Sequence, residues 1–224
     1  MPVFRPKSRD EKGPRAVKRV RAPFVGKGTA LTKVNRLARV LDRMMEKKAL
    51  DLPISSGILG LDNAGQIFEL SFIASGDARF ERTGLQVSPV ALYLKGQMQP
   101  SSTDVRNTIR IVVFRWNDTT APLMSNVLSP TFADKTIAPY TWANSGTKLK
   151  ILHDSVHAMN WSAESWRSDI AYRIPFSATD QIRYNGTGAG DGEFGRVFLL
   201  MVSDSAATPH PSAELVSRLV YRDA

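Results

Sequence analysis

The chain has 224 residues, 42% of them hydrophobic, and it carries a net charge of +9 and no cysteine. This length and apolar content suffice for one sizeable core, while the lack of cysteine excludes a disulfide scaffold and thiolate metal sites. No run of about 18 apolar residues is present, which excludes a membrane-spanning helix. The first ten residues lack the apolar region of a signal peptide, which predicts a protein that is intracellular, at least when it is made.

Positive charge is concentrated in the first 50 residues, defined here as the basic arm. The arm holds 15 Lys and Arg against four acids, a net charge of +11, while residues 51–224 hold 15 against 17, a net charge of −2. A basic tail that only aids solubility or targeting is one interpretation. Such a sharp division favours a polyanion as the partner, usually nucleic acid. The cations expected to bind it are Arg5, Lys7, Arg9, Lys12, Arg15, Lys18, Arg19, Arg21, Lys27, Lys33, Arg36, Arg39 and Arg43.

The arm divides into two parts. Residues 1–28 contain four prolines, three glycines and no apolar periodicity, which predicts disorder in isolation. The basic run at residues 18–21 matches what a nuclear import receptor reads. In residues 29–49, apolar side chains recur every three or four positions, with cations on most other faces, and Pro53 follows. This pattern predicts an amphipathic helix whose apolar stripe packs on protein and not on a membrane.

The body is expected to contain β-strands throughout. After an extended segment at 54–61, three runs rich in β-branched and aromatic residues follow at 66–74, 85–98 and 106–116, separated by turn residues. They predict three successive antiparallel strands. Further strands are expected at 148–159, 168–176, 181–184, 196–203 and 214–222. About eight strands with long, uneven connections predict an all-β, two-sheet sandwich or jelly roll.

The longest connection in the body covers residues 117–147, with one helical turn expected at 124–128. Connections of this length are usually functional or contact a neighbour, and this one is unusually apolar. We interpret it as a patch covered by another subunit. The alternative is that part of it covers the domain's own core. The residues assigned to a subunit interface are Trp116, Leu123, Met124, Phe132, Tyr140 and Trp142.

No residue pattern indicates an enzyme. Gly190–Gly195 matches G-x-G-x-x-G but precedes a strand, so it predicts a hairpin loop and not a dinucleotide site. His153, Asp154 and His157 could bind a metal, yet their spacing implies no third ligand. Asp118, Asp134 and Asp154 could hold calcium at a subunit interface. No other cofactor is expected.

A resemblance to a known family rests on the order of the motifs. The basic arm, then Arg79-Phe-Glu-Arg-Thr-Gly84, a long strand, and Val105-Arg-Asn-Thr-Ile-Arg-Ile-Val-Val-Phe-Arg115 resemble the single jelly-roll coat proteins of small icosahedral viruses. Among these, the chain resembles the satellite tobacco necrosis virus type and the capsid proteins of circular Rep-encoding single-stranded DNA viruses. Lys150–Asp154 and Arg218–Asp223 resemble later elements of the same proteins.

This resemblance implies an eight-stranded jelly-roll shell domain at 51–224 that assembles with copies of itself. In the simplest form, T=1, about 60 copies would carry about 660 positive charges on their arms, enough to offset a similar number of phosphates. The expected partner is a single-stranded DNA or RNA genome. The expected location is the virion, with assembly in the host nucleus or cytoplasm. A non-assembling β-sandwich that binds nucleic acid or glycans, with a basic tail, is the alternative.

Overall fold

The computed structural model describes residues 46–56, 60–104, 106–160, 167–206 and 208–223. The chain separates into two compact units, 1–43 and 44–224, and the first lies outside the described residues. No described helix is long and apolar enough to cross a membrane. The elements are β1 (Lys47–Ser55), β2 (Gln66–Glu69), β3 (Gln86–Gln99), β4 (Arg106–Trp116), α2 (Met124–Val127), β5 (Leu149–Asn160), β6 (Ser168–Pro175), β7 (Ile182–Tyr184), β8 (Gly192–Phe194), β9 (Arg196–Ser203) and β10 (Ser212–Asp223).

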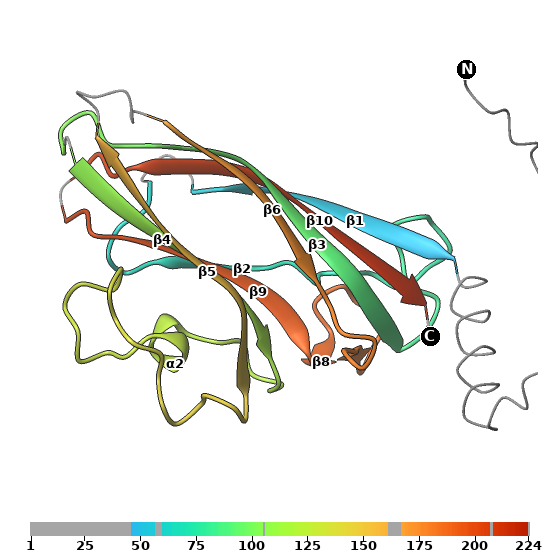
Figure 1. The fold of residues 1–224 in the computed structure, drawn as a ribbon. Helices are drawn as coiled ribbons and strands as arrows, with labels where there is room; N and C mark the ends of the chain where they lie inside the picture. Colours follow the sequence, from blue (N-terminus) through green and yellow to red (C-terminus); the bar gives the residue numbers. More distant parts are fainter. Residues whose placement is uncertain (1–45, 57–59, 105, 161–166, 207, 224) are drawn as a thin grey trace, which may run out of the picture. The chain divides into compact units, whose positions relative to one another are not determined.

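The strands form two antiparallel sheets that pack face to face (Figure 1). Sheet A has the order β1-β10-β3-β7-β8, and β6 also pairs with β3. Sheet B has the order β2-β9-β4-β5. The strand pairs are nested along the chain: β1 with β10, β2 with β9, β3 with β6, and β4 with β5. Successive pairs alternate between the sheets, which is the topology of a jelly roll. The predicted all-β jelly-roll sandwich is therefore confirmed, and β7 and β8 are additional to the eight strands of these four pairs.

The three central runs, predicted as three successive antiparallel strands, do not pair with one another. β2 and β4 lie in sheet B, separated by β9, while β3 lies in sheet A. The first run is also shorter than predicted, because strand pairing ends at Glu69. The reason is that a side-chain period specifies which face of a strand is buried, but not which distant strand lies beside it.

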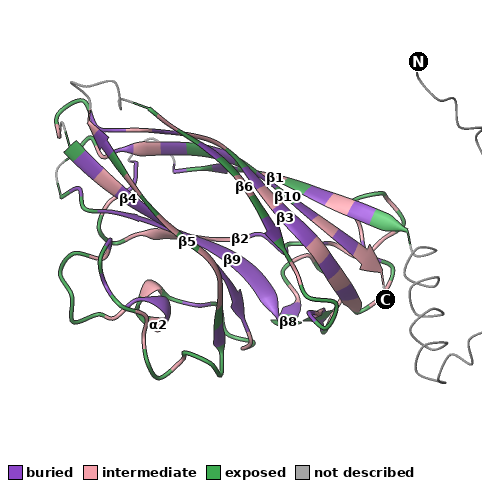
Figure 2. Ribbon diagram, viewed as in Figure 1, coloured by how far each residue is buried: buried purple, intermediate pink, exposed green. Residues whose placement is uncertain are grey.

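The main core lies between the sheets. In β3, Leu92, Leu94 and Met98 point inward and are fully buried, and from sheet B they meet alternate residues such as Ile111 and Leu199. β4 and β9 are buried along almost their whole length (Figure 2). Strands buried on both faces read as continuous apolar runs, so the second face of sheet B must also be covered.

The predicted helix at 29–49 is wrong at its C-terminal end. Residues 47–49 belong to β1, which pairs with β10 from Lys47↔Arg222 to Ser55↔Glu214. This strand crosses the predicted domain boundary between residues 50 and 51, and it includes the first part of the predicted 54–61 segment. Its burial alternates, and the buried Lys48 ammonium is held by Asp223 at 2.8 Å and by the Glu81 carbonyl at 3.0 Å. This ion pair lets a lysine occupy an inward position of a strand. Residues 29–45 and the predicted disorder at 1–28 lie outside the described residues.

Candidate assembly surfaces

The 117–147 connection covers the outer face of sheet B. Val112, Phe114 and Trp116 of β4, together with Phe198 and Leu200 of β9, form a second core with Val127, Leu128 and Ala138 of the connection. The Phe114 and Phe198 rings stack with centroids 5.7 Å apart. The Trp116 indole N–H donates to the Thr120 carbonyl at 2.7 Å. The connection is thus a packed layer of the subunit, and α2 lies within it.

A charged cluster fastens this layer to sheet B. Arg110 of β4 is 7% exposed and donates to both carboxylate oxygens of Asp154 on β5, at 3.0 and 2.7 Å, and to the Ala138 carbonyl at 2.6 Å. The Tyr140 hydroxyl also donates to Asp154. Burial alone would raise the pKa of Asp154, but the hydrogen bonds from Arg110 and Tyr140 lower it below its ordinary value. Asp154 therefore carries a full negative charge at neutral pH, between two donors.

Replacement of this carboxylate is expected to destabilise the subunit. Asp154→Asn leaves the Arg110 charge buried without its counter-ion, which predicts a loss of about 1–3 kcal/mol in the free energy of unfolding. Urea unfolding at pH 7 measures this, with Asp169→Asn as the control because Asp169 forms an exposed pair with Arg167. Since the folded-state pKa of Asp154 is lowered, its contribution is complete above the ordinary value of 3.8 and is lost as the pH falls below it. An equal loss in both variants at pH 7 would contradict this role for the cluster.

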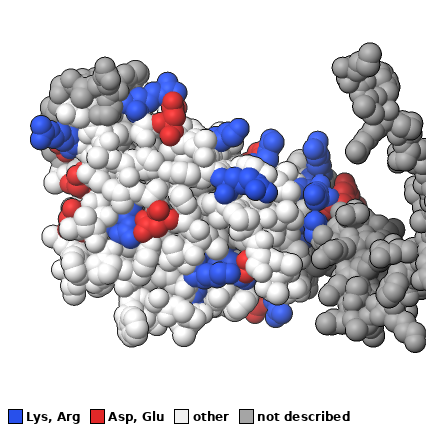
Figure 3. All heavy atoms as spheres, in the orientation of Figure 1, with Lys and Arg blue, Asp and Glu red and all other residues white. Residues whose placement is uncertain are grey.

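Part of the connection is strongly exposed and apolar. The exposed fractions are 91% for Trp142, 70% for Ile137, 67% for Leu123 and 43% for Phe132. The surface over α2 and its neighbouring loops is largely free of charged side chains in the view of Figure 3. These four are the large apolar side chains of the connection that the subunit leaves exposed.

The predicted interface residues therefore divide into three groups. Trp116 is 3% exposed, so its assignment to a subunit interface is wrong. Met124 and Tyr140 are partly buried against the second core, as the alternative interpretation of the connection expected. Leu123, Phe132 and Trp142 remain available for an interface. Ile137 was missed because a single isoleucine between Thr136 and Ala138 gives no periodic signal.

The thirteen cations predicted to bind nucleic acid all lie outside the described residues. The predicted calcium ligands do not come together within the subunit: Asp118 pairs with Lys148, Asp134 accepts from Thr136, and Asp154 pairs with Arg110. Within the described ranges there is no group of three or more His, Asp or Glu side chains that could hold a metal. Calcium between subunits stays a prediction.

The two histidines of β5 do share a face, as their spacing predicts. His153 and His157 lie beside Tyr172 of β6, with ring centroids 4.1 and 6.2 Å from the tyrosine ring. A His157 ring nitrogen lies 2.6 Å from the Tyr172 hydroxyl. Burial lowers the pKa of both histidines. The negative charge of Asp154 opposes this effect for His153, and the electrostatic interaction with His153 lowers the pKa of His157 further. The neutral rings are thus part of the junction between the two sheets.

This junction predicts a loss of stability in mild acid. Because the folded-state pKa values lie below the ordinary 6.5, the unfolded chain binds more protons, and stability falls as the pH drops through 6.5. His153→Gln is expected to reduce the fall in melting temperature between pH 7 and pH 5. The control is His210→Gln, whose histidine lies in the β9–β10 connection. A pH dependence unchanged in His153→Gln would show that this ring does not titrate in that range.

Comparisons with known proteins give structural likeness only. No family model and no curated protein matches the chain. Among solved structures, it is similar to that of Desmodium yellow mottle tymovirus (13% identity, covering 79% of this chain and 86% of that chain, TM-score 0.38) and of tomato aspermy virus (12%, 86% and 94%, 0.38). It is also similar to the native virion of Kashmir bee virus (11%, 96% and 83%, 0.37). Because these TM-scores lie below 0.5, function rests on the chain's own residues.

Proposed function

We propose that this chain is a viral coat protein that assembles into a closed shell and packages single-stranded nucleic acid. The observation that carries the proposal is the union of a jelly-roll body of net charge −2 with an arm of net charge +11. The body of such a chain is suited to be a rigid building block, and the arm is suited to bind a polyanion. The motif order in residues 79–115, which resembles that of small icosahedral virus coat proteins, supports the same function.

Assembly needs a surface that recurs at every copy. A closed shell is built from identical contacts repeated by symmetry. The exposed Leu123, Ile137 and Trp142 supply apolar area of the kind that a partner subunit covers. The layer that carries them is held to sheet B by Arg110 and Asp154, so it would present them rigidly.

Single-stranded nucleic acid suits the arm. Lys and Arg bind any phosphate backbone by releasing its counterions, without base specificity. A single strand bends at little cost inside a small shell, whereas duplex DNA resists bending with a persistence length of about 50 nm. Both DNA and RNA supply the phosphates. A nuclear import receptor would recognise the basic run at residues 18–21 in the newly made chain before assembly.

Particle size tests the proposal directly. The full chain, expressed and purified, is expected to sediment as a particle, and a shell of about 60 copies of the 24.7 kDa chain would weigh about 1.5 MDa before its cargo is counted. Electron microscopy should show closed shells, and nuclease-protected nucleic acid should be recovered from them. A monomer or small oligomer that binds oligonucleotides or glycans would overturn the proposal in favour of a non-assembling β-sandwich.

A further inference from the structure

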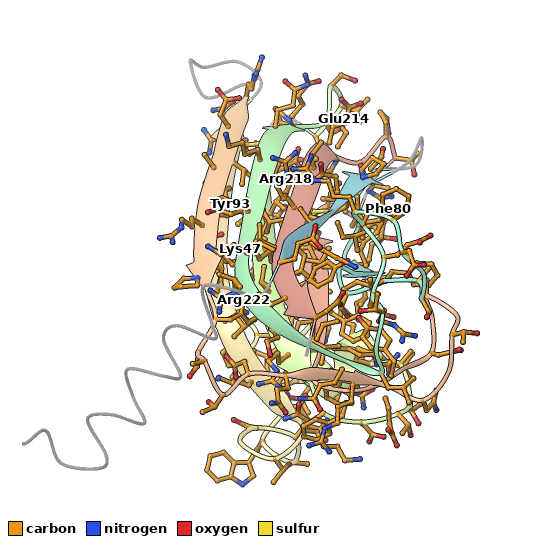
Figure 4. The ribbon with its side chains drawn as sticks, turned by 90° about the vertical axis from the view of Figure 1, so that its right-hand side faces the viewer. Lys47, Phe80, Tyr93, Glu214, Arg218 and Arg222 are labelled. Carbon is orange, nitrogen blue, oxygen red and sulfur yellow. The ribbon has the colours of Figure 1, made fainter. Side chains whose placement is uncertain are left out.

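The two sheets differ in what lies on their outer faces. The outer face of sheet B is covered by the 117–147 connection, as described above. The outer face of sheet A, where β6, β3, β10 and β1 lie side by side (Figure 4), is lined by exposed or partly exposed side chains. Open grooves run along it, and one is lined by Asp51, Tyr93, Lys95, Val216, Arg218 and Val220.

Cations lie along this face, from Lys47 at the start of β1 to Lys95 toward the C-terminal end of β3. Strand register places Asp51, Arg218, Tyr93 and Arg173 in one row across the four strands, with Lys95 two residues further along β3. At the start of β1, Lys47 is paired in register with Arg222. Glu214 lies at the opposite end of the sheet from Lys47 and Arg222 (Figure 4). The exposed cations of this face are Lys47, Lys95, Arg173 and Arg218, and Arg79 lies beside its β1 edge.

Other cations of the body are used differently. Arg82, Arg110, Arg115 and Arg196 are all less than 9% exposed. They bind internal carbonyls or carboxylates, as when Arg82 donates to the Ile73 and Gly84 carbonyls at 3.1 and 2.6 Å. On sheet A, Arg218 forms an exposed pair with Asp51, but Lys47, Arg79 and Lys95 form no ion pair within the described ranges. The net charge of −2 therefore conceals a basic surface that internal contacts do not neutralise.

Aromatic side chains accompany these cations. Phe80 is 56% exposed and lines a second groove with Arg79, Asp51 and Arg218, at the β1 side of the same face. Tyr93 lies within the row of charges, and its hydroxyl accepts a hydrogen bond from Arg173 at 3.3 Å. Cations that follow a backbone, interleaved with aromatic rings on which bases stack, are how proteins bind single-stranded nucleic acid without sequence preference.

We infer that the outer face of sheet A, which carries Lys47, Lys95 and Arg173 and has Phe80 at its β1 side, is a second binding surface for single-stranded nucleic acid. Lys47 is the first residue of β1 and follows the thirteen arm cations in the sequence, so the two groups of cations belong to neighbouring stretches of one chain. The inference rests on the proposed function and adds to it: the folded body, and not the arm alone, binds the packaged strand, and sheet A faces the cargo.

Charge removal on the full-length chain tests the electrostatic part. Lys95→Gln with Arg173→Gln is compared with Arg106→Gln and Lys148→Gln, which remove two exposed charges from outside sheet A. Affinity for a fluorescent oligothymidylate is measured over a range of salt concentrations. With a slope of about 0.7 per phosphate contact on single strands, the sheet A variant should lower the salt slope by about 1.4 and the control should not change it.

An aromatic substitution tests whether the ligand is nucleic acid. Phe80→Ala is expected to weaken oligothymidylate binding by about 5- to 150-fold, the range for one stacked base. Phe72→Ala, which truncates a ring of similar exposure outside the strands of sheet A, is the control. Heparin binding should be unaffected by Phe80→Ala, because a polysaccharide has no bases. Ultraviolet cross-links from packaged nucleic acid should include the peptides that contain Phe80 and Tyr93.

The outcomes separate this inference from the proposed function. Equal salt slopes for the sheet A variant and its control, or cross-links confined to residues 1–46, would overturn the inference while shells still form around nucleic acid. If the charge variant weakens heparin and oligonucleotide alike and Phe80→Ala weakens neither, the face binds polyanions generally, and its assignment to nucleic acid is wrong. If the full chain forms no particles, the proposed function itself fails.

Discussion

A chain that lacks residues 1–28 is expected to assemble into shells that contain little or no nucleic acid. This segment holds nine Lys and Arg and two acids, a net charge of +7 out of the arm's +11. Each neutralised phosphate contributes counterion release, so affinity falls steeply as contacts are lost. The jelly-roll body begins at β1 and includes every described strand, so its fold should persist. The ratio of absorbance at 260 and 280 nm in purified particles measures the cargo.

The control for this deletion keeps the charge of residues 1–28 and changes only their order in the sequence. A full-length variant in which residues 1–28 are shuffled should package normally, because binding to a phosphate backbone depends on charge and not on sequence. Full cargo in the truncated particles would contradict the role of the arm. Loss of cargo in the shuffled variant would show that the arm reads a specific partner instead of the backbone.

Truncation of the exposed apolar residues on the connection is expected to abolish assembly without unfolding the subunit. Trp142 is 91% and Leu123 67% exposed, so Leu123→Ala with Trp142→Ala removes little internal packing. Aromatic anchors at interface centres commonly cost about 2 kcal/mol or more when they are truncated to alanine. In a shell this loss recurs at every equivalent contact, so a modest change per subunit becomes a large one for the particle.

Circular dichroism and sedimentation together decide this prediction. The expected result is a β-rich spectrum and a thermal transition like that of the natural chain, with no particles. Leu85→Ala with Phe194→Ala is the control, since these residues are 58% and 43% exposed but lie outside the connection. Normal shells from the connection variant would remove Leu123 and Trp142 from the subunit contacts. Loss of both fold and particles would place them in the subunit's own packing.

The structure also changes which residues such an experiment should use. From the sequence, Tyr140 and Trp142 appear equivalent, two aromatic residues in one apolar connection. In the fold, Tyr140 packs against the second core and donates a hydrogen bond to Asp154. Its truncation would therefore disturb the subunit itself. Leu123 replaces it in the test because its exposure separates assembly from stability.

Local patterns in the sequence determined the strands and the charge division. β9 begins and ends at the predicted residues, and β5, β6, β7, β10 and α2 do so within two residues. The period of buried residues and the turn residues between the runs act over short distances, so they can be read along the chain. The +11 arm is likewise visible in the sequence alone, although its residues up to 45 lie outside the described structure.

Only the tertiary structure decided which strands are neighbours and which apolar residues are covered. The pairing of β1 with β10 joins residues more than 150 positions apart, and it turned residues 47–49, predicted as helix, into a strand whose buried Lys48 is neutralised by Asp223. The same long-range packing buried Trp116 and left Trp142 exposed. Burial and pairing depend on contacts between distant segments, which no local period contains. For that reason the basic face of sheet A, assembled from four strands, could not be found in the sequence.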